Sequence, residues 1–163
     1  MTSPNGSAAS DVSLSELYQE VILDHNRRPR NFKKIEGASA VVHGVNPLCG
    51  DDFHLYLKKD AQGIIKEAGF EGQGCAISKS SASMMTSLIQ NKDSKSVESL
   101  KDSFIRLLTT DNVTEEDKKN LGSLKIFEGV KNYPIRVKCA TLIWRALEAA
   151  LKTDSQKNEV STE

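Results

Sequence analysis

The chain has 163 residues, 38% of them hydrophobic and 27% charged, which is typical of a globular protein with one domain. Lys plus Arg and Asp plus Glu each number 22, so we expect no basic surface for nucleic acid or an anionic membrane. The sequence has no apolar run of membrane-spanning length, and its first residues, MTSPNGSAAS, do not resemble a secretory signal. We therefore expect a cytoplasmic protein.

The first half of the chain predicts a lead-in, a helix and three strands. Residues 1–12 are small and polar, which indicates disorder. A capping-box pattern at 13–16 begins a helix that ends before Pro29. Strands are expected over 40–43, 53–58 and 64–70, with a hairpin turn at 59–63.

The second half predicts helices over residues 78–90, 97–108, 124–131 and 134–152. Pro134 suits the first turn of the last helix. The highly charged stretch 111–122 predicts a helical excursion that is exposed to solvent. Residues 153–163 indicate a disordered tail, so one domain is expected over 13–152.

Strands followed by helices indicate the α+β class. We expect a small antiparallel three-stranded sheet packed against helices.

Three cysteines and one aspartate are the candidate functional residues. Cys49 follows a turn signal, and Gly50 allows Cys49 and Asp51 to point the same way. Cys75 follows two nearby glycines at the expected start of a helix, where exposed N–H groups favour an anion. Cys139 lies on the apolar stripe of the last helix, so burial as a small hydrophobic residue is a strong alternative for it.

Three sulfurs and one carboxylate suit tetrahedral zinc. The separations, 26 residues from Cys49 to Cys75 and 64 from there to Cys139, match no zinc-finger spacing. An odd number of cysteines in a reducing compartment also favours a metal or reactive thiols over disulfides. The three histidines, His25, His43 and His54, are expected to be structural or surface residues.

Three segments resemble the SufU/IscU family of iron–sulfur assembly proteins: NPLCGDDFHLYL, GQGCAISKSSASMM and YPIRVKCATLIW. The resemblance extends from Leu14 to Leu151. It implies the compact SufE/IscU-like α+β fold, in which Cys49, Asp51, Cys75 and Cys139 gather at one end as metal ligands.

Within that family, three features of the chain resemble the SufU type rather than the IscU scaffolds. Lys138 replaces a histidine that scaffolds carry before the third cysteine. Residues 132–136 lack the Leu-Pro-Pro-Val-Lys motif for a dedicated Hsp70 chaperone. The segment between Cys75 and Cys139 is also longer.

The resemblance implies a zinc-dependent sulfurtransferase that accepts persulfide sulfur from SufS, a pyridoxal-phosphate-dependent cysteine desulfurase. Downstream sulfur or cluster acceptors are its other implied partners. We expect Cys49 to receive the sulfur because its loop can leave the metal most readily. Arg136 lies one helical turn from Cys139 and is expected at the site opening, with a plain surface arginine as the alternative.

Two other functions stay open. One is an IscU-type scaffold that builds a transient 2Fe-2S cluster on the same ligands. The other is a non-catalytic protein in which zinc is structural.

Overall fold

The structure is a computed structural model that describes residues 18–153 and 158–162. Its first helix is described from residue 18 and continues to residue 27, which agrees with the predicted end before Pro29. The predicted capping box at 13–16 and the lead-in at 1–12 lie outside the described residues.

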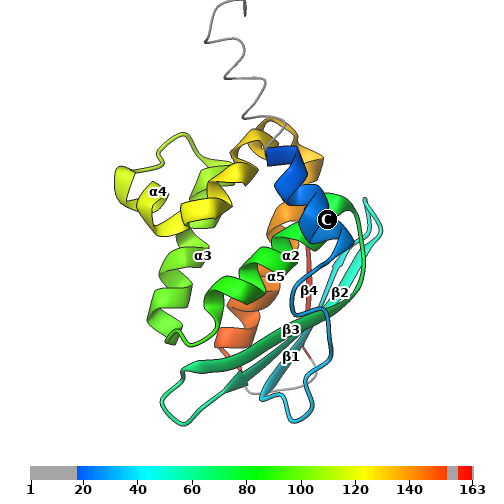
Figure 1. Cartoon of the computed structure of the whole chain (residues 1–163), viewed down its shortest axis with the longest axis vertical. Helices are drawn as coiled ribbons and strands as arrows, with labels where there is room; N and C mark the ends of the chain where they lie inside the picture. The colour runs from blue at the N-terminus through cyan, green and yellow to red at the C-terminus, as the bar shows by residue number, and fades with distance from the viewer. Residues whose placement is uncertain (1–17, 154–157, 163) are drawn as a thin grey trace, which may run out of the picture.

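A four-stranded sheet forms one layer of the molecule (Figure 1). The strands are β1 (Ala40–Asn46), β2 (Asp51–Lys59), β3 (Ile65–Gln73) and β4 (Asn158–Ser161), in the order β3-β2-β1-β4. The first three pair antiparallel, and β4 pairs parallel to β1. The α+β class and the antiparallel arrangement of the three predicted strands are confirmed, but the sheet also has a fourth strand that was not predicted.

The fourth strand also corrects the predicted tail. Residues 158–161 lie in the segment 153–163, which was expected to be disordered, yet their backbone pairs with β1. Parallel pairing joins residues more than one hundred positions apart, so local sequence carries little signal for it.

Helices cover one face of the sheet (Figure 1). They are α2 (Ala76–Ile89), α3 (Ser94–Thr109), α4 (Glu115–Leu121), a 3-10 helix (Gly122–Asn132) and α5 (Pro134–Leu151). The helices α2 and α5 contact each other and the sheet, while α3 packs on α5. Alternating residues of β1 and β2 point into this layer, including Val42 and Leu55, both fully buried.

Trp144 marks the centre of the helical layer. Its side chain has no exposed surface, stacks on Phe104 with ring centroids 4.5 Å apart, and donates a 3.0 Å hydrogen bond from Nε1 to Oγ of Ser81. Since α2 provides Ser81, α3 provides Phe104 and α5 provides Trp144, one side chain joins three helices.

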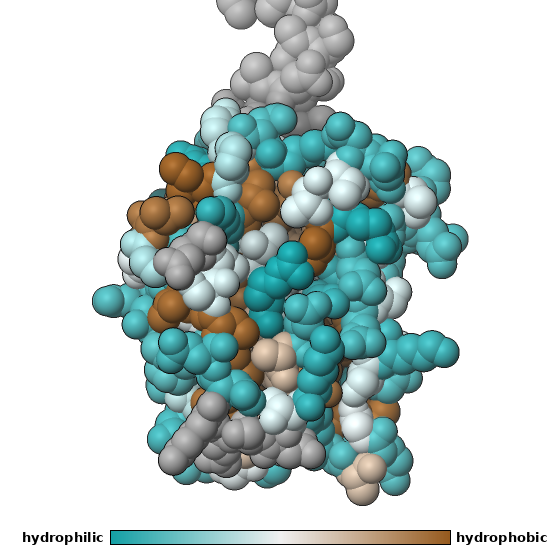
Figure 2. Space-filling view, turned by 180° about the vertical axis from the view of Figure 1, so that it is seen from behind, coloured by the Kyte–Doolittle hydropathy of each residue, from teal (hydrophilic) through white to brown (hydrophobic). Residues whose placement is uncertain are grey.

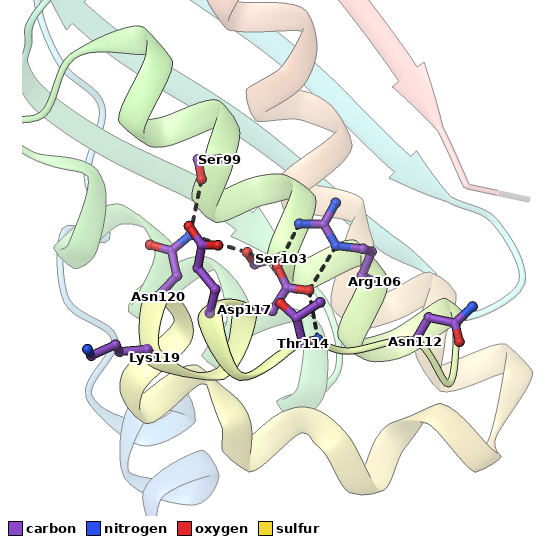
Figure 3. A pocket seen from close by; sticks show the side chains of 9 residues that line it. Ser99, Ser103, Arg106, Asn112, Thr114, Asp117, Lys119 and Asn120 are labelled. Carbon is purple, nitrogen blue, oxygen red and sulfur yellow. Dashed lines mark hydrogen bonds and ion pairs between the residues drawn. The ribbon is translucent and has the colours of Figure 1, made fainter.

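The charged excursion is helical as predicted, but it is not wholly exposed. Asp117 in α4 is 4% exposed, and its carboxylate accepts hydrogen bonds from Arg106 and Ser103 of α3 (Figure 3). The same residue completes a capping box with Thr114 at the start of α4. The prediction of a solvent-exposed face is therefore wrong at Asp117, which fastens α4 to α3.

The reverse side of the molecule is mostly hydrophilic, with hydrophobic side chains in small groups (Figure 2). In the described part of the chain, no helix is long and apolar enough to cross a membrane.

Candidate metal centre

The four predicted ligands belong to elements that meet at one end of the strands, where β1 ends and β2 begins. The chain leaves β1 at Asn46, turns through Cys49 and enters β2 at Asp51. Antiparallel pairing brings the end of β3 beside the start of β2, so Cys75 follows at the beginning of α2. Cys139 projects from the second turn of α5, which packs on both β1 and α2.

The carboxylate of Asp51 lies at the centre of this arrangement and is 2% exposed. Its Oδ1 accepts hydrogen bonds from the backbone N–H of Cys75 and from Oγ of Ser78, both at 3.0 Å. Its Oδ2 accepts a longer hydrogen bond, of 3.3 Å, from Nδ2 of Asn46. Among the described residues, no Lys or Arg forms an ion pair with Asp51.

The structure brings three of the four predicted ligands close together. The ligand atoms of Cys49, Asp51 and Cys139 all lie within 4.8 Å of one another. Cys75 is outside this group, because its Sγ caps α2 and accepts from the N–H of Ser78 at 3.4 Å. The hydrogen bond from the backbone N–H of Cys75 to Asp51 nevertheless keeps the fourth thiol next to the other three ligands.

Electrostatics disfavours a free thiolate at Cys139. Burial raises the pKa of the Cys139 thiol, and the hydrogen bond with Cys49 and the negative charges of Cys75 and Asp51 raise it further. A bound divalent cation reverses this effect, since it deprotonates a coordinating thiol. Without a cation these donor groups disfavour one another's negative charge, and a bound metal ion removes this repulsion.

Two glycines, Gly50 and Gly74, allow the backbone to bring the ligands together. Gly50, between Cys49 and Asp51, has a φ of +70°, a backbone conformation that residues other than glycine rarely adopt. Gly74 has no room for a side chain, because a Cβ there would lie 2.7 Å from Oδ1 of Asp51 and 2.5 Å from Oγ of Ser78.

Asn46 belongs to the site but was not predicted. Its side chain has no exposed surface, and Nδ2 lies 3.3 Å from Oδ2 of Asp51 and 3.5 Å from Sγ of Cys139. Its Oδ1 is buried without a hydrogen-bond partner. Sequence reasoning assigned Asn46 only to a turn; the signal that finds it is its cross-strand pairing with Asp51.

The two basic residues near Cys139, Arg136 and Lys138, each line a groove on the surface. The guanidinium of Arg136 lies over the Tyr133 ring, 5.5 Å from its centroid. Arg136 also lines a groove of about 490 Å³ between the first helix and the 3-10 helix. Lys138 instead lines a groove next to β4.

Three thiols and one carboxylate are a donor set that zinc accepts in tetrahedral sites. The residues present therefore fit a zinc ion held by Cys49, Asp51, Cys139 and Cys75, provided that the Cys75 side chain turns toward the other three.

The fold and this cysteine–aspartate centre define the class of iron–sulfur assembly proteins. The chain belongs to the family described as the NifU-like N terminal domain, whose model matches residues 17–158.

Relatives and solved structures agree with this assignment. The chain is 40% identical over 148 residues to the zinc-dependent sulfurtransferase SufU of Bacillus subtilis, covering 91% of this chain and 98% of that protein. It is 37% identical to the iron–sulfur cluster assembly scaffold protein IscU of Thermotoga maritima, covering 86% of this chain and 96% of the relative.

Among solved structures, a protein from Fervidobacterium islandicum AW-1, described as a candidate SUF-system assembly scaffold, superimposes with a TM-score of 0.73 at 36% identity. That match covers 81% of this chain and 94% of the other. The SufU/IscU-like fold implied by the three motifs is confirmed.

Proposed function

We propose that this protein is a cytoplasmic, zinc-bound sulfur acceptor that takes persulfide sulfur from a cysteine desulfurase of the SufS type. It then relays that sulfur to acceptor proteins for iron–sulfur cluster assembly. The observation that carries the proposal is the convergence of Cys49, Asp51 and Cys139 within 4.8 Å, with Cys75 hydrogen-bonded to the same aspartate. The 40% identity to a zinc-dependent sulfurtransferase supports it.

Cys49 is the thiol best placed to receive the sulfur. It lies on the loop between β1 and β2, it is only partly buried, and the neighbouring Leu48 is 62% exposed. Cys139 is 2% exposed in the second turn of α5, and Cys75 is held at the N-terminus of α2. Gly50 gives the Cys49 loop further freedom to swing outward.

The transfer is an exchange between sulfurs. The thiolate of Cys49 attacks the outer sulfur of the desulfurase persulfide, and a new S–S bond forms on Cys49. The S–S bond of the donor breaks, so the desulfurase cysteine leaves as a thiolate. One persulfide is lost and one is gained, and no external oxidant or reductant is needed.

Zinc, when bound, holds the thiols deprotonated without redox chemistry of its own. This chain's residues supply the rest: Asn46 and Ser78 orient Asp51, and the Cys49 loop presents its thiol to the partner.

An IscU-type scaffold that carries a transient 2Fe-2S cluster is the second candidate. It is favoured by relatives of 34% and 37% identity that are named scaffold proteins. Lys138 in place of the scaffolds' histidine favours the sulfurtransferase, because that position offers no imidazole ligand.

A desulfurase assay separates these functions. We expect alanine formation from cysteine by a SufS-type desulfurase to rise when the zinc-loaded protein is added, and Cys49→Ser to abolish the rise. Purified protein that carries a coloured iron–sulfur cluster and gives no stimulation supports the scaffold instead. Zinc content with neither colour nor stimulation supports a structural zinc protein.

A further inference from the structure

A second group of metal-binding side chains lies on the outer face of the sheet. Asp52 follows the inward-pointing Asp51, and alternation along β2 directs Asp52 and His54 away from the helices. His43 of β1 is paired directly with His54. The two imidazoles and the carboxylate therefore occupy one patch on the surface opposite the cysteine centre.

The side chains of this patch are already close. The His43 and His54 rings stack with centroids 4.3 Å apart and planes inclined by only 4°. Nε2 of His43 lies 2.7 Å from Oδ1 of Asp52, and ligand atoms of all three residues lie within 4.8 Å of one another. All three are partly exposed, so an ion has access from solvent.

We propose that His43, His54 and Asp52 form a second metal site, which binds a divalent transition-metal ion of the zinc type. Two imidazoles with one carboxylate are ligands that zinc accepts, whereas magnesium and calcium prefer oxygen alone. Zinc bonds to nitrogen and oxygen of about 2.0–2.2 Å place tetrahedral ligand atoms roughly 3.3 Å apart. Cross-strand pairing fixes the backbone, and the ligand atoms already lie within 4.8 Å of one another. We therefore expect side-chain rotations alone to bring the ligand atoms to the spacing that zinc requires.

The C-terminal strand supplies a residue that orients the site. Nδ1 of His43 lies 3.5 Å from Oε2 of Glu159 in β4, on the opposite side of the ring from Asp52. A carboxylate at one ring nitrogen fixes the tautomer and leaves the other nitrogen for the metal, as at many zinc-bound histidines. Metal binding at His43 is thereby linked to the pairing of β4 with β1.

The simpler alternative is that His43 and Asp52 form only a surface ion pair, with His54 stacked beside them. This alternative predicts no metal binding at the patch, so a titration distinguishes the two.

The experiment uses the full chain without a purification tag, first loaded with one equivalent of zinc. Further Zn²⁺ is added in a calorimeter, and the histidine side chains are followed by NMR. We expect a second, weaker equivalent that shifts the His43 and His54 ring signals. His54→Gln should remove this equivalent, and Glu159→Gln should weaken it by about tenfold.

His25→Gln is the matched control, because His25 lies outside the patch and contacts Ser83 of α2. It should leave the second equivalent unchanged. A wild-type protein that binds no zinc at the patch overturns the proposal, as does a second equivalent that persists in His54→Gln. Neither result depends on desulfurase activity, so this proposal and the proposed function fail separately.

Discussion

The backbone N–H of Cys75 donates a 3.0 Å hydrogen bond to Oδ1 of Asp51, which joins the start of α2 to the start of β2. This bond places a thiol and a carboxylate together without a metal ion. Because Ser78 also occupies Oδ1, the less engaged Oδ2 is the oxygen that we expect to face zinc.

Asp51→Ala should retain zinc on the three cysteines but release it faster. The substitution removes one ligand and leaves the N–H of Cys75 without its acceptor, at a cost of about 1–3 kcal/mol in unfolding free energy. The Ser78 hydroxyl still has the carbonyl oxygen of Cys75 at 3.1 Å. Zinc release to a coloured chelator measures the exchange. Asp52→Ala, at the outward-facing neighbour, should release the centre's zinc at the wild-type rate; equal release from both variants would remove Asp51 from the ligand set.

Gly74→Ala should disrupt the centre without changing any ligand. Its methyl group would lie 2.7 Å from Oδ1 of Asp51 and 2.7 Å from Cε2 of Phe53, so Asp51 must move. We expect zinc affinity to fall by about tenfold or more. Gly129→Ala is the control, because nothing lies within 4 Å of the added carbon there. Unchanged affinity in Gly74→Ala would show that the position of Asp51 is not critical.

The Asp117 carboxylate should make stability depend on acidic pH. The hydrogen bond from the Arg106 guanidinium, followed by that from Ser103, holds the pKa of Asp117 well below its ordinary value of 3.8. As the pH falls, Asp117 therefore takes up a proton in the unfolded chain before it does so in the folded protein. The stabilisation that the ionised carboxylate gives the folded protein is complete above pH 3.8 and is lost as the pH falls below it.

The measurement is urea unfolding of the metal-free, reduced protein at pH values above and below 3.8. Asp117→Asn should make the unfolding free energy fall less steeply with decreasing pH than in the wild type. Glu98→Gln, an exposed change on α3, should keep the wild-type slope. Identical slopes in all three proteins would contradict the assigned pKa shift.

Arg136→Ala should weaken stimulation of the desulfurase while zinc content stays the same. Arg136 is exposed and lies over Tyr133, so we expect its effect to come through contact with the partner. Arg145→Ala, farther along α5, is the control. Loss of zinc from Arg136→Ala would make Arg136 structural, and full stimulation would make it an ordinary surface residue.

Local patterns in the sequence were sufficient for most of the fold. Alternation at Phe53, Leu55 and Leu57 predicted the central strand, and Pro134 marked the start of α5. The two glycines before Cys75 correctly placed it at the N-terminus of a helix. Each of these signals acts within a few residues, so it does not depend on the rest of the chain.

Features that depend on distant pairing could not be read in this way. β4 contains a single large apolar residue, Val160, and it is stabilised by a strand far away in the chain. Asn46 becomes part of the centre, and His43 meets His54, only through the register of β1 with β2. Asp117 looked solvent-exposed because its partners, Arg106 and Ser103, belong to another helix.

Mass mapping of the protein, after reaction with a SufS-type desulfurase and cysteine, shows directly which thiol receives the sulfur. Peptides that contain Cys49, Cys75 and Cys139 are separated without reduction, and the position of the added sulfur is determined. We expect one additional sulfur on Cys49, with the more enclosed Cys139 and the capping Cys75 unmodified. Sulfur on Cys75 or Cys139, with Cys49 unmodified, would contradict it.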